Sequence, residues 1–144
     1  MTLYLDTSSL IKLYVEEPGS DEVRRDLSDA SAAATSLVTY AEARAVFARL
    51  RRSGNITPTG FRAAKRDLDT DWPILMVVPP SDGLCRSAGD LAERYGVRGF
   101  DGIHLATFLY LAKNDPSEVR FSSFDRTLNR AALTALRHQR RSRV

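Results

Sequence analysis

Four carboxylates occupy similar places in this sequence, each at or near the start of an expected helix. They are Asp6, Glu42, Asp101 and Asp125. Asp6 and Asp125 each follow an apolar run with the composition of a buried strand. Carboxylates gathered in one pocket raise one another's pKa values unless a cation holds them. Oxygen ligands without a cysteine or histidine cluster suit Mg²⁺ or Mn²⁺, so convergence of these acids would indicate a divalent-metal site.

Each of these acids also has a purely structural explanation. Aspartate is a preferred helix N-cap, which would account for Asp6, Asp101 and Asp125 taken singly. Thr39 and Glu42 fit a capping box, in which the glutamate accepts a hydrogen bond from the Thr39 backbone N–H. Both explanations stay open for each acid alone, and convergence of the side chains would favour the metal site.

The elements that must position these acids alternate along the chain. Short apolar runs predict four strands, and periodic apolar segments between them predict helices. The strands are expected at residues 3–5, 32–36, 74–78 and 119–124. Such alternation is typical of parallel pairing with right-handed crossovers. Since parallel strands end at one sheet edge, Asp6 and Asp125 should face the same way, with Glu42 and Asp101 beginning helices on that side. We therefore predict an α/β domain in which helices flank a parallel sheet of four or five strands.

Three segments needed a choice between competing signals. By helix propensity alone, the alanines of residues 32–36 would extend a helix, but the alternation of elements favours a buried strand. Residues 37–71 are long for one crossover and are expected to project as a helical hairpin. Residues 137–144 are expected to form a disordered basic tail that attracts RNA weakly. The whole chain, residues 1–144, is expected to be a single domain.

Composition limits the possible partners and compartment. The formal net charge is +3, and arginine greatly outnumbers lysine. An arginine-rich surface suits a polyanion, although a GC-rich genome would raise arginine content equally well. The single cysteine, Cys85, excludes an intramolecular disulfide and is expected to be half-buried. Neither a signal peptide nor an apolar run long enough for a membrane span is present, which predicts a cytoplasmic protein without a membrane partner.

Four motifs in register resemble those of PIN domains, and of VapC-type toxins in particular. Residues 4–10, Tyr-Leu-Asp-Thr-Ser-Ser-Leu, look like the opening motif, and Glu42 matches the second acid. Residues 100–106, Phe-Asp-Gly-Ile-His-Leu-Ala, are similar to the motif carrying the third acid, with Gly102 in place of the usual alanine. Residues 121–128 resemble the last strand and its terminal acid. The usual final strand after the last helix has no counterpart here.

The resemblance implies a three-layer PIN fold and a Mg²⁺- or Mn²⁺-dependent endoribonuclease that cleaves structured cellular RNA, such as tRNA or rRNA. It also implies neutralisation by a cognate antitoxin and homodimerisation. The metal ligands implied are Asp6, Glu42, Asp101 and Asp125. Ser8 and Ser123 match hydroxyl positions that orient ligands or water. His104, one turn after Asp101, is expected to be a hydrogen-bonded core residue rather than a catalytic one.

Two competing functions have specific requirements. A receiver-like regulatory domain would need an acidic pair near the first strand and a lysine after the last strand. The chain offers neither, and its lysines are Lys12, Lys65 and Lys113. A PIN-fold protein that binds nucleic acid without cutting it would not need all four acids.

Overall fold

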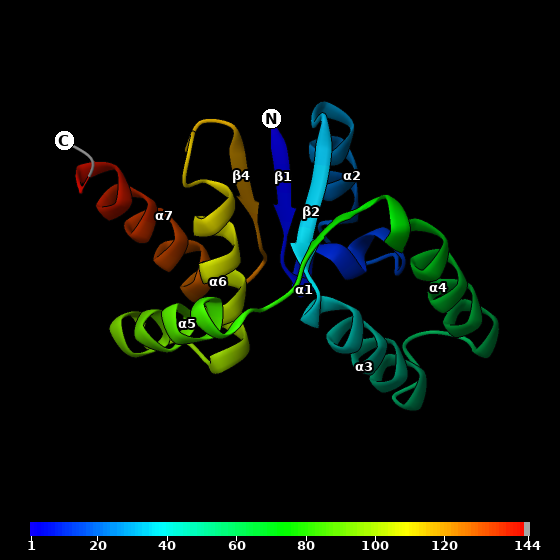
Figure 1. Ribbon diagram of the computed structural model, residues 1–144. Helices are drawn as coiled ribbons and strands as arrows, with labels where there is room; N and C mark the ends of the chain where they lie inside the picture. Colours follow the sequence, from blue (N-terminus) through cyan, green and yellow to red (C-terminus); the bar gives the residue numbers. More distant parts are fainter. Residues whose placement is uncertain (143–144) are drawn as a thin grey trace.

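The computed structural model describes residues 1–142 and contains one parallel sheet (Figure 1). Its strands are β1 (Thr2–Leu5), β2 (Ala32–Ser36), β3 (Met76–Val78) and β4 (Val119–Ser122). They pair in the order β3-β2-β1-β4, and every pairing is parallel. Leu5 is in register with Ser122, so Asp6 and Ser123 leave neighbouring strands at the same edge.

Helices cover both faces of the sheet. The α-helices are α1 (Thr7–Leu10), α2 (Ser20–Asp29), α3 (Val38–Arg52), α4 (Pro58–Asp71), α5 (Asp82–Tyr95), α6 (Gly99–Leu111) and α7 (Arg126–Arg141). Because side chains alternate along a strand, Leu3 and Leu5 point to one face and Tyr4 to the other. The leucines pack with α1 to α4, whereas Tyr4 packs with α6 and α7. The predicted three-layer α/β fold is confirmed, with four strands in the described residues.

Figure 1 shows α3 and α4 side by side, on the far side of the sheet from α5, α6 and α7. Thr57 caps α4 by accepting a hydrogen bond from the Gly60 backbone N–H, and Pro58 follows at the first helical position. Phe47 and Leu68 bury this pair of helices against the leucine face of the sheet. None of the helices within residues 1–142 has the length and apolar character needed to cross a bilayer.

Several sequence-based expectations were wrong in detail. The third strand begins at Met76 because Pro73 lies in a 3₁₀ turn, η2 (Trp72–Ile74), where Ile74 is 81% exposed. The single cysteine, Cys85, is exposed on α5 rather than half-buried. The expected disordered tail is helical through Arg141, since Leu128, Ala131, Ala132 and Ala135 give α7 a buried apolar face. The rest of that prediction, residues 143–144, lies outside the described residues.

The capping explanations have different outcomes for the four acids. Asp6 and Asp125 do cap α1 and α7. Asp101 does not cap α6, which begins at Gly99 with Arg98 at its N-cap. The capping box is also wrong, because α3 begins at Val38 and the Thr39 hydroxyl pairs with the Thr35 hydroxyl instead. Glu42 and Asp101 are therefore free of the structural roles proposed for them.

Candidate active site

Asp6 is at the centre of the candidate site. Its carboxylate is 4% exposed and accepts three hydrogen bonds within 3 Å. Oδ1 accepts from the Ser9 backbone N–H at 2.9 Å and from the Ser8 hydroxyl at 2.7 Å. Oδ2 accepts from the Ser123 hydroxyl at 2.6 Å, which brings in the loop after β4. Helix capping explains only the first of these bonds, so the chain supplies Asp6 with more donors than a cap needs.

Burial and hydrogen bonding have opposite effects on the pKa of Asp6. Burial raises the pKa of its carboxyl group from the ordinary value of 3.8, and the hydrogen bonds from Ser123 and Ser8 oppose that rise without cancelling it. A buried carboxylate whose charged form is disfavoured is stabilised by any cation that reaches it.

Without metal, the wild type should lose stability as pH rises and Asp6 ionises, and we expect Asp6→Asn to remove this loss. Because the folded-state pKa of Asp6 is raised, the native state holds its proton to a higher pH than the unfolded state does. The free energy of unfolding therefore falls as pH rises from the ordinary pKa through the raised one. Asparagine keeps the helix cap but cannot ionise.

Thermal denaturation in EDTA, from about pH 4 to about pH 7, measures this effect. The melting temperature of the variant should rise relative to that of the wild type as pH increases through this window. A constant difference across the range would contradict the expectation.

Glu42, on the second turn of α3, is held by residues from two other helices. The Thr7 hydroxyl donates to Oε1 at 2.7 Å, and His104 Nε2 lies 2.8 Å from the same oxygen. Burial alone would raise the pKa of Glu42, but the hydrogen bonds from His104 and Thr7 lower it below its ordinary value. Glu42 is therefore held in its ionised form.

Asp101, in the first turn of α6, lies within the electrostatic reach of the other three acids. It is half-buried, and within residues 1–142 its carboxylate has neither a hydrogen bond nor an ion pair. Burial raises the pKa of Asp101, the charges of Asp125, Glu42 and Asp6 raise it further, and His104 opposes the rise without cancelling it. One carboxylate oxygen of Asp125 accepts a hydrogen bond from the Leu128 backbone N–H at 2.9 Å. The fold thus brings the four acids predicted from the sequence into one neighbourhood.

The donor set matches a hard cation. It consists of carboxylate oxygens, and within residues 1–142 no hydrogen bond to Asp101 helps His104 to offset the repulsion from the other acids. In the described part of the chain, however, no three acidic, histidine or cysteine side chains are already close enough to enclose an ion. The residues present fit a divalent metal by their chemistry, and their side chains would have to move closer together to bind it.

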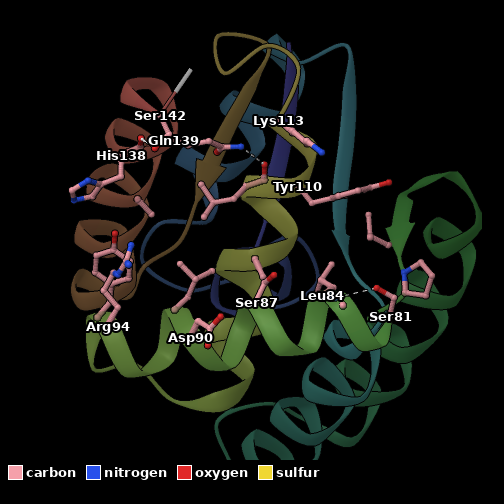
Figure 2. Close-up of a pocket in the computed structure, with 18 residues that line it drawn as sticks. Ser81, Leu84, Ser87, Asp90, Arg94, Tyr110, Lys113, His138, Gln139 and Ser142 are labelled. Atoms are coloured by element: carbon pink, nitrogen blue, oxygen red, sulfur yellow. Dashed lines mark hydrogen bonds between the residues drawn. The ribbon is translucent and has the colours of Figure 1, made fainter. Parts of the chain in front are cut away.

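Two hollows of the molecule differ in their relation to the acids. Glu42 and Asp101, but not Asp6 or Asp125, line a cleft of about 630 Å³ together with Arg98 and Phe100. A larger cavity of about 820 Å³ lies between α5, α6 and α7, and none of the four acids lines it (Figure 2). The smaller hollow, named here the acidic cleft, is therefore the place to look for chemistry.

Sequence reasoning gave no site role to two of the residues that hold Glu42. Thr7 directly follows Asp6, and its position inside the first motif was the available signal. His104 was recognised as near Asp101 but was interpreted as a core residue. That interpretation is confirmed, because His104 is 1% exposed and hydrogen-bonded, and the structure adds a contact with Glu42. That contact could not be predicted, because residues 42 and 104 meet only through tertiary packing.

Comparison with known proteins identifies the family. A family model described as PIN domain matches residues 3–134, and the chain belongs to the PIN domain family. Within it, the chain is similar to VapC-type proteins. "Ribonuclease VapC45" and "Ribonuclease VapC49", from two strains of Mycobacterium tuberculosis, are each 32% identical to it over 133 residues. Each match covers 92% of this chain and 90% of the relative, so the resemblance predicted from the motifs is confirmed.

Solved structures share the fold at low sequence identity. FitAcB from Neisseria gonorrhoeae has a TM-score of 0.65 at 19% identity, covering 90% of this chain and 92% of that one. PAE2754 from Pyrobaculum aerophilum has a TM-score of 0.63 at 18% identity, with coverages of 97% and 90%. A toxin–antitoxin complex from Klebsiella pneumoniae has a TM-score of 0.59 at 18% identity, with coverages of 85% and 86%.

Proposed function

We propose that this chain is a Mg²⁺- or Mn²⁺-dependent endoribonuclease that acts as the toxin of a toxin–antitoxin pair. The observation that carries the proposal is the state of Asp101, a half-buried carboxylate with no donor in the described residues and with three other acids near enough to raise its pKa. Two relatives named as ribonucleases support the reaction class. The fold shared with a toxin–antitoxin complex supports the biological role.

In this proposal Asp6, Glu42, Asp101 and Asp125 hold the ion. When bound, a divalent ion at such a site lowers the pKa of a water molecule and stabilises negative charge developing at phosphorus. The chain itself keeps the acids in place. Ser8 and Ser123 orient Asp6 through hydrogen bonds. The Leu128 backbone N–H fixes one oxygen of Asp125, which caps α7. Water would attack the phosphorus and displace one ribose oxygen, which leaves as a hydroxyl after taking up a proton, while the phosphate stays on the other fragment; no enzyme side chain forms a covalent bond with the RNA.

The acidic cleft also carries groups suited to RNA. Arg98 is exposed and can pair with a phosphate, and Phe100 is 57% exposed beside Asp101. Exposed aromatic rings stack on unpaired bases. We propose that tRNA or rRNA presents a single-stranded segment to this cleft. A cognate antitoxin is proposed to block the cleft. The protein is proposed to work as a homodimer.

Phe100→Ala is expected to raise the KM for RNA by about 10-fold, because the variant loses one base-stacking contact. Its kcat should change little, since the ring is proposed to bind a base of the substrate and not the ion. Phe100→Trp should retain the wild-type KM. Tyr110→Ala is a matched control, because Tyr110 is an equally exposed aromatic residue that lines the larger cavity instead. An unchanged KM in Phe100→Ala would remove this residue from the substrate path.

The overall proposal is tested by incubating purified protein with total RNA. Cleavage is expected in Mg²⁺ or Mn²⁺, to stop in EDTA, and to return when the metal is restored. Cleavage of full strength in EDTA would overturn the metal-dependent mechanism. Absence of cleavage with either metal, on tRNA and rRNA alike, would favour the alternative of a PIN-fold protein that binds nucleic acid without cutting it.

A further inference from the structure

Two consecutive hydrogen bonds connect Tyr4 of β1 to Glu42 through the buried side chain of His104. The Tyr4 hydroxyl lies 2.9 Å from His104 Nδ1, and His104 Nε2 lies 2.8 Å from Glu42 Oε1. Tyr4 is fully buried and His104 is 1% exposed. Neither residue belongs to the set of acids, yet together they connect the centre of the sheet to one of them.

The chemistry of the partners assigns the direction of these bonds. A carboxylate can only accept, so Nε2 carries a hydrogen and donates to Glu42. When the imidazole is neutral, Nδ1 is an acceptor and the Tyr4 hydroxyl donates to it; when the ring is protonated, Nδ1 donates to the Tyr4 oxygen instead. Glu42 therefore requires the hydrogen on Nε2, and the hydrogen bond between Tyr4 and Nδ1 holds the ring in the orientation that points this donor at Glu42.

The two oxygens of Glu42 differ in their surroundings. Oε1 accepts from both Thr7 and His104, whereas no hydrogen bond to Oε2 is found within residues 1–142. The protein thus fixes the carboxylate by one oxygen and leaves the other available. Glu42 also lines the acidic cleft with Asp101, so the available oxygen belongs to a side chain that borders the proposed metal site.

We infer that His104, oriented by Tyr4, is a positioning residue that holds Glu42 ready for the metal. This inference rests on the proposed function. His104 has almost no exposed surface, and both ring nitrogens are already within hydrogen-bonding distance of protein groups, so it does not reach the substrate. Residues that orient metal-binding side chains in this way commonly change metal affinity or activity by about 10- to 100-fold when they are replaced.

Three variants separate this role from simple packing. His104→Leu fills the site without a donor. His104→Gln places an amide N–H near the position of Nε2 and should restore the bond to Glu42. Tyr4→Phe removes only the hydroxyl that orients the imidazole and keeps the ring stacked on Phe121.

The measurement is Mn²⁺ binding by isothermal titration calorimetry, without RNA. His104→Leu should bind Mn²⁺ about 10- to 100-fold more weakly than the wild type. Tyr4→Phe should also bind more weakly, and His104→Gln should stay within a few-fold of the wild type. In cleavage assays, the loss in His104→Leu should appear as a higher Mn²⁺ requirement, with the KM for RNA unchanged.

Wild-type Mn²⁺ affinity in His104→Leu would overturn the inference, as would His104→Gln behaving like His104→Leu. Should His104→Leu not fold, Tyr4→Phe decides the question, because unchanged Mn²⁺ affinity in that variant overturns the inference and weaker binding supports it. A wild-type protein that binds no Mn²⁺ and cuts no RNA would instead overturn the proposed function, and the inference with it.

Discussion

Asp6→Asn is expected to reduce RNA cleavage by at least about 100-fold, because replacing even the groups that orient a metal ligand costs 10- to 100-fold and Asp6 is proposed as a ligand itself. The amide is nearly the same size as the carboxylate but carries no charge to hold the ion. Asparagine is as good an N-cap as aspartate, so α1 should keep its first turn. The variant should therefore fold normally while losing activity.

The assay compares initial cleavage rates at saturating Mn²⁺, together with circular dichroism to confirm the fold. Asp29→Asn is a matched control, because Asp29 is an exposed acid at the far end of α2. It should cleave RNA at the wild-type rate. Cleavage by Asp6→Asn within a few-fold of the wild type would mean that Asp6 is a helix cap and not part of the active site.

Gly102→Ala should destabilise the protein, although alanine favours helices over glycine by about 1 kcal/mol. A Cβ at residue 102 would lie 2.5 Å from the Ala88 carbonyl oxygen, where α6 crosses α5. That atom belongs to a helix backbone and cannot rotate away, so α5 must shift. Overpacking of this kind costs about 1–3 kcal/mol, which outweighs the gain in helix propensity. Gly102→Val should be worse, because its branched side chain adds further contacts with Ala88 and Ala92.

Urea denaturation measures this loss as a lower unfolding midpoint at unchanged slope. Gly89→Ala is the matched control on α5, because nothing lies within 4 Å of a Cβ at that position. It should be neutral or stabilising by up to about 1 kcal/mol. Equal effects of alanine at both positions would show that the α5–α6 contact does not restrict residue 102. Because Asp101 is the neighbouring residue, Gly102→Ala should also lower cleavage.

Periodicity and the alternation of elements were sufficient to predict the parallel sheet, because each strand is a short apolar run followed by a helix signal. The alanines of β2 could be assigned only through this alternation, since their own propensity favours a helix. Residues 137–141 form a basic segment whose composition alone favours disorder. They are helical because they continue α7, whose earlier apolar residues are buried. The late start of β3 depended on Pro73, whose turn was not recognised.

The acids of the candidate site could be placed near one another because they follow strands or lie in the first two turns of helices at one edge of a parallel sheet. The residues that hydrogen-bond to Glu42 could not be predicted in the same way. Thr7 and His104 meet Glu42 through contacts across 35 and 62 residues of sequence, and no local pattern records such contacts. The resemblance to PIN domains supplied the order of the acids, whereas the hydrogen-bond partners became visible only in the folded chain.

The most direct test of the account is a crystal structure of the wild type soaked in Mn²⁺, with the ion located by its anomalous scattering. We predict a peak between Asp6 and Asp101, with Glu42 and Asp125 as direct or water-mediated ligands, and no such peak in Asp6→Asn. Mn²⁺ bound elsewhere, or no peak in crystals of a protein that cleaves RNA in EDTA, would contradict it.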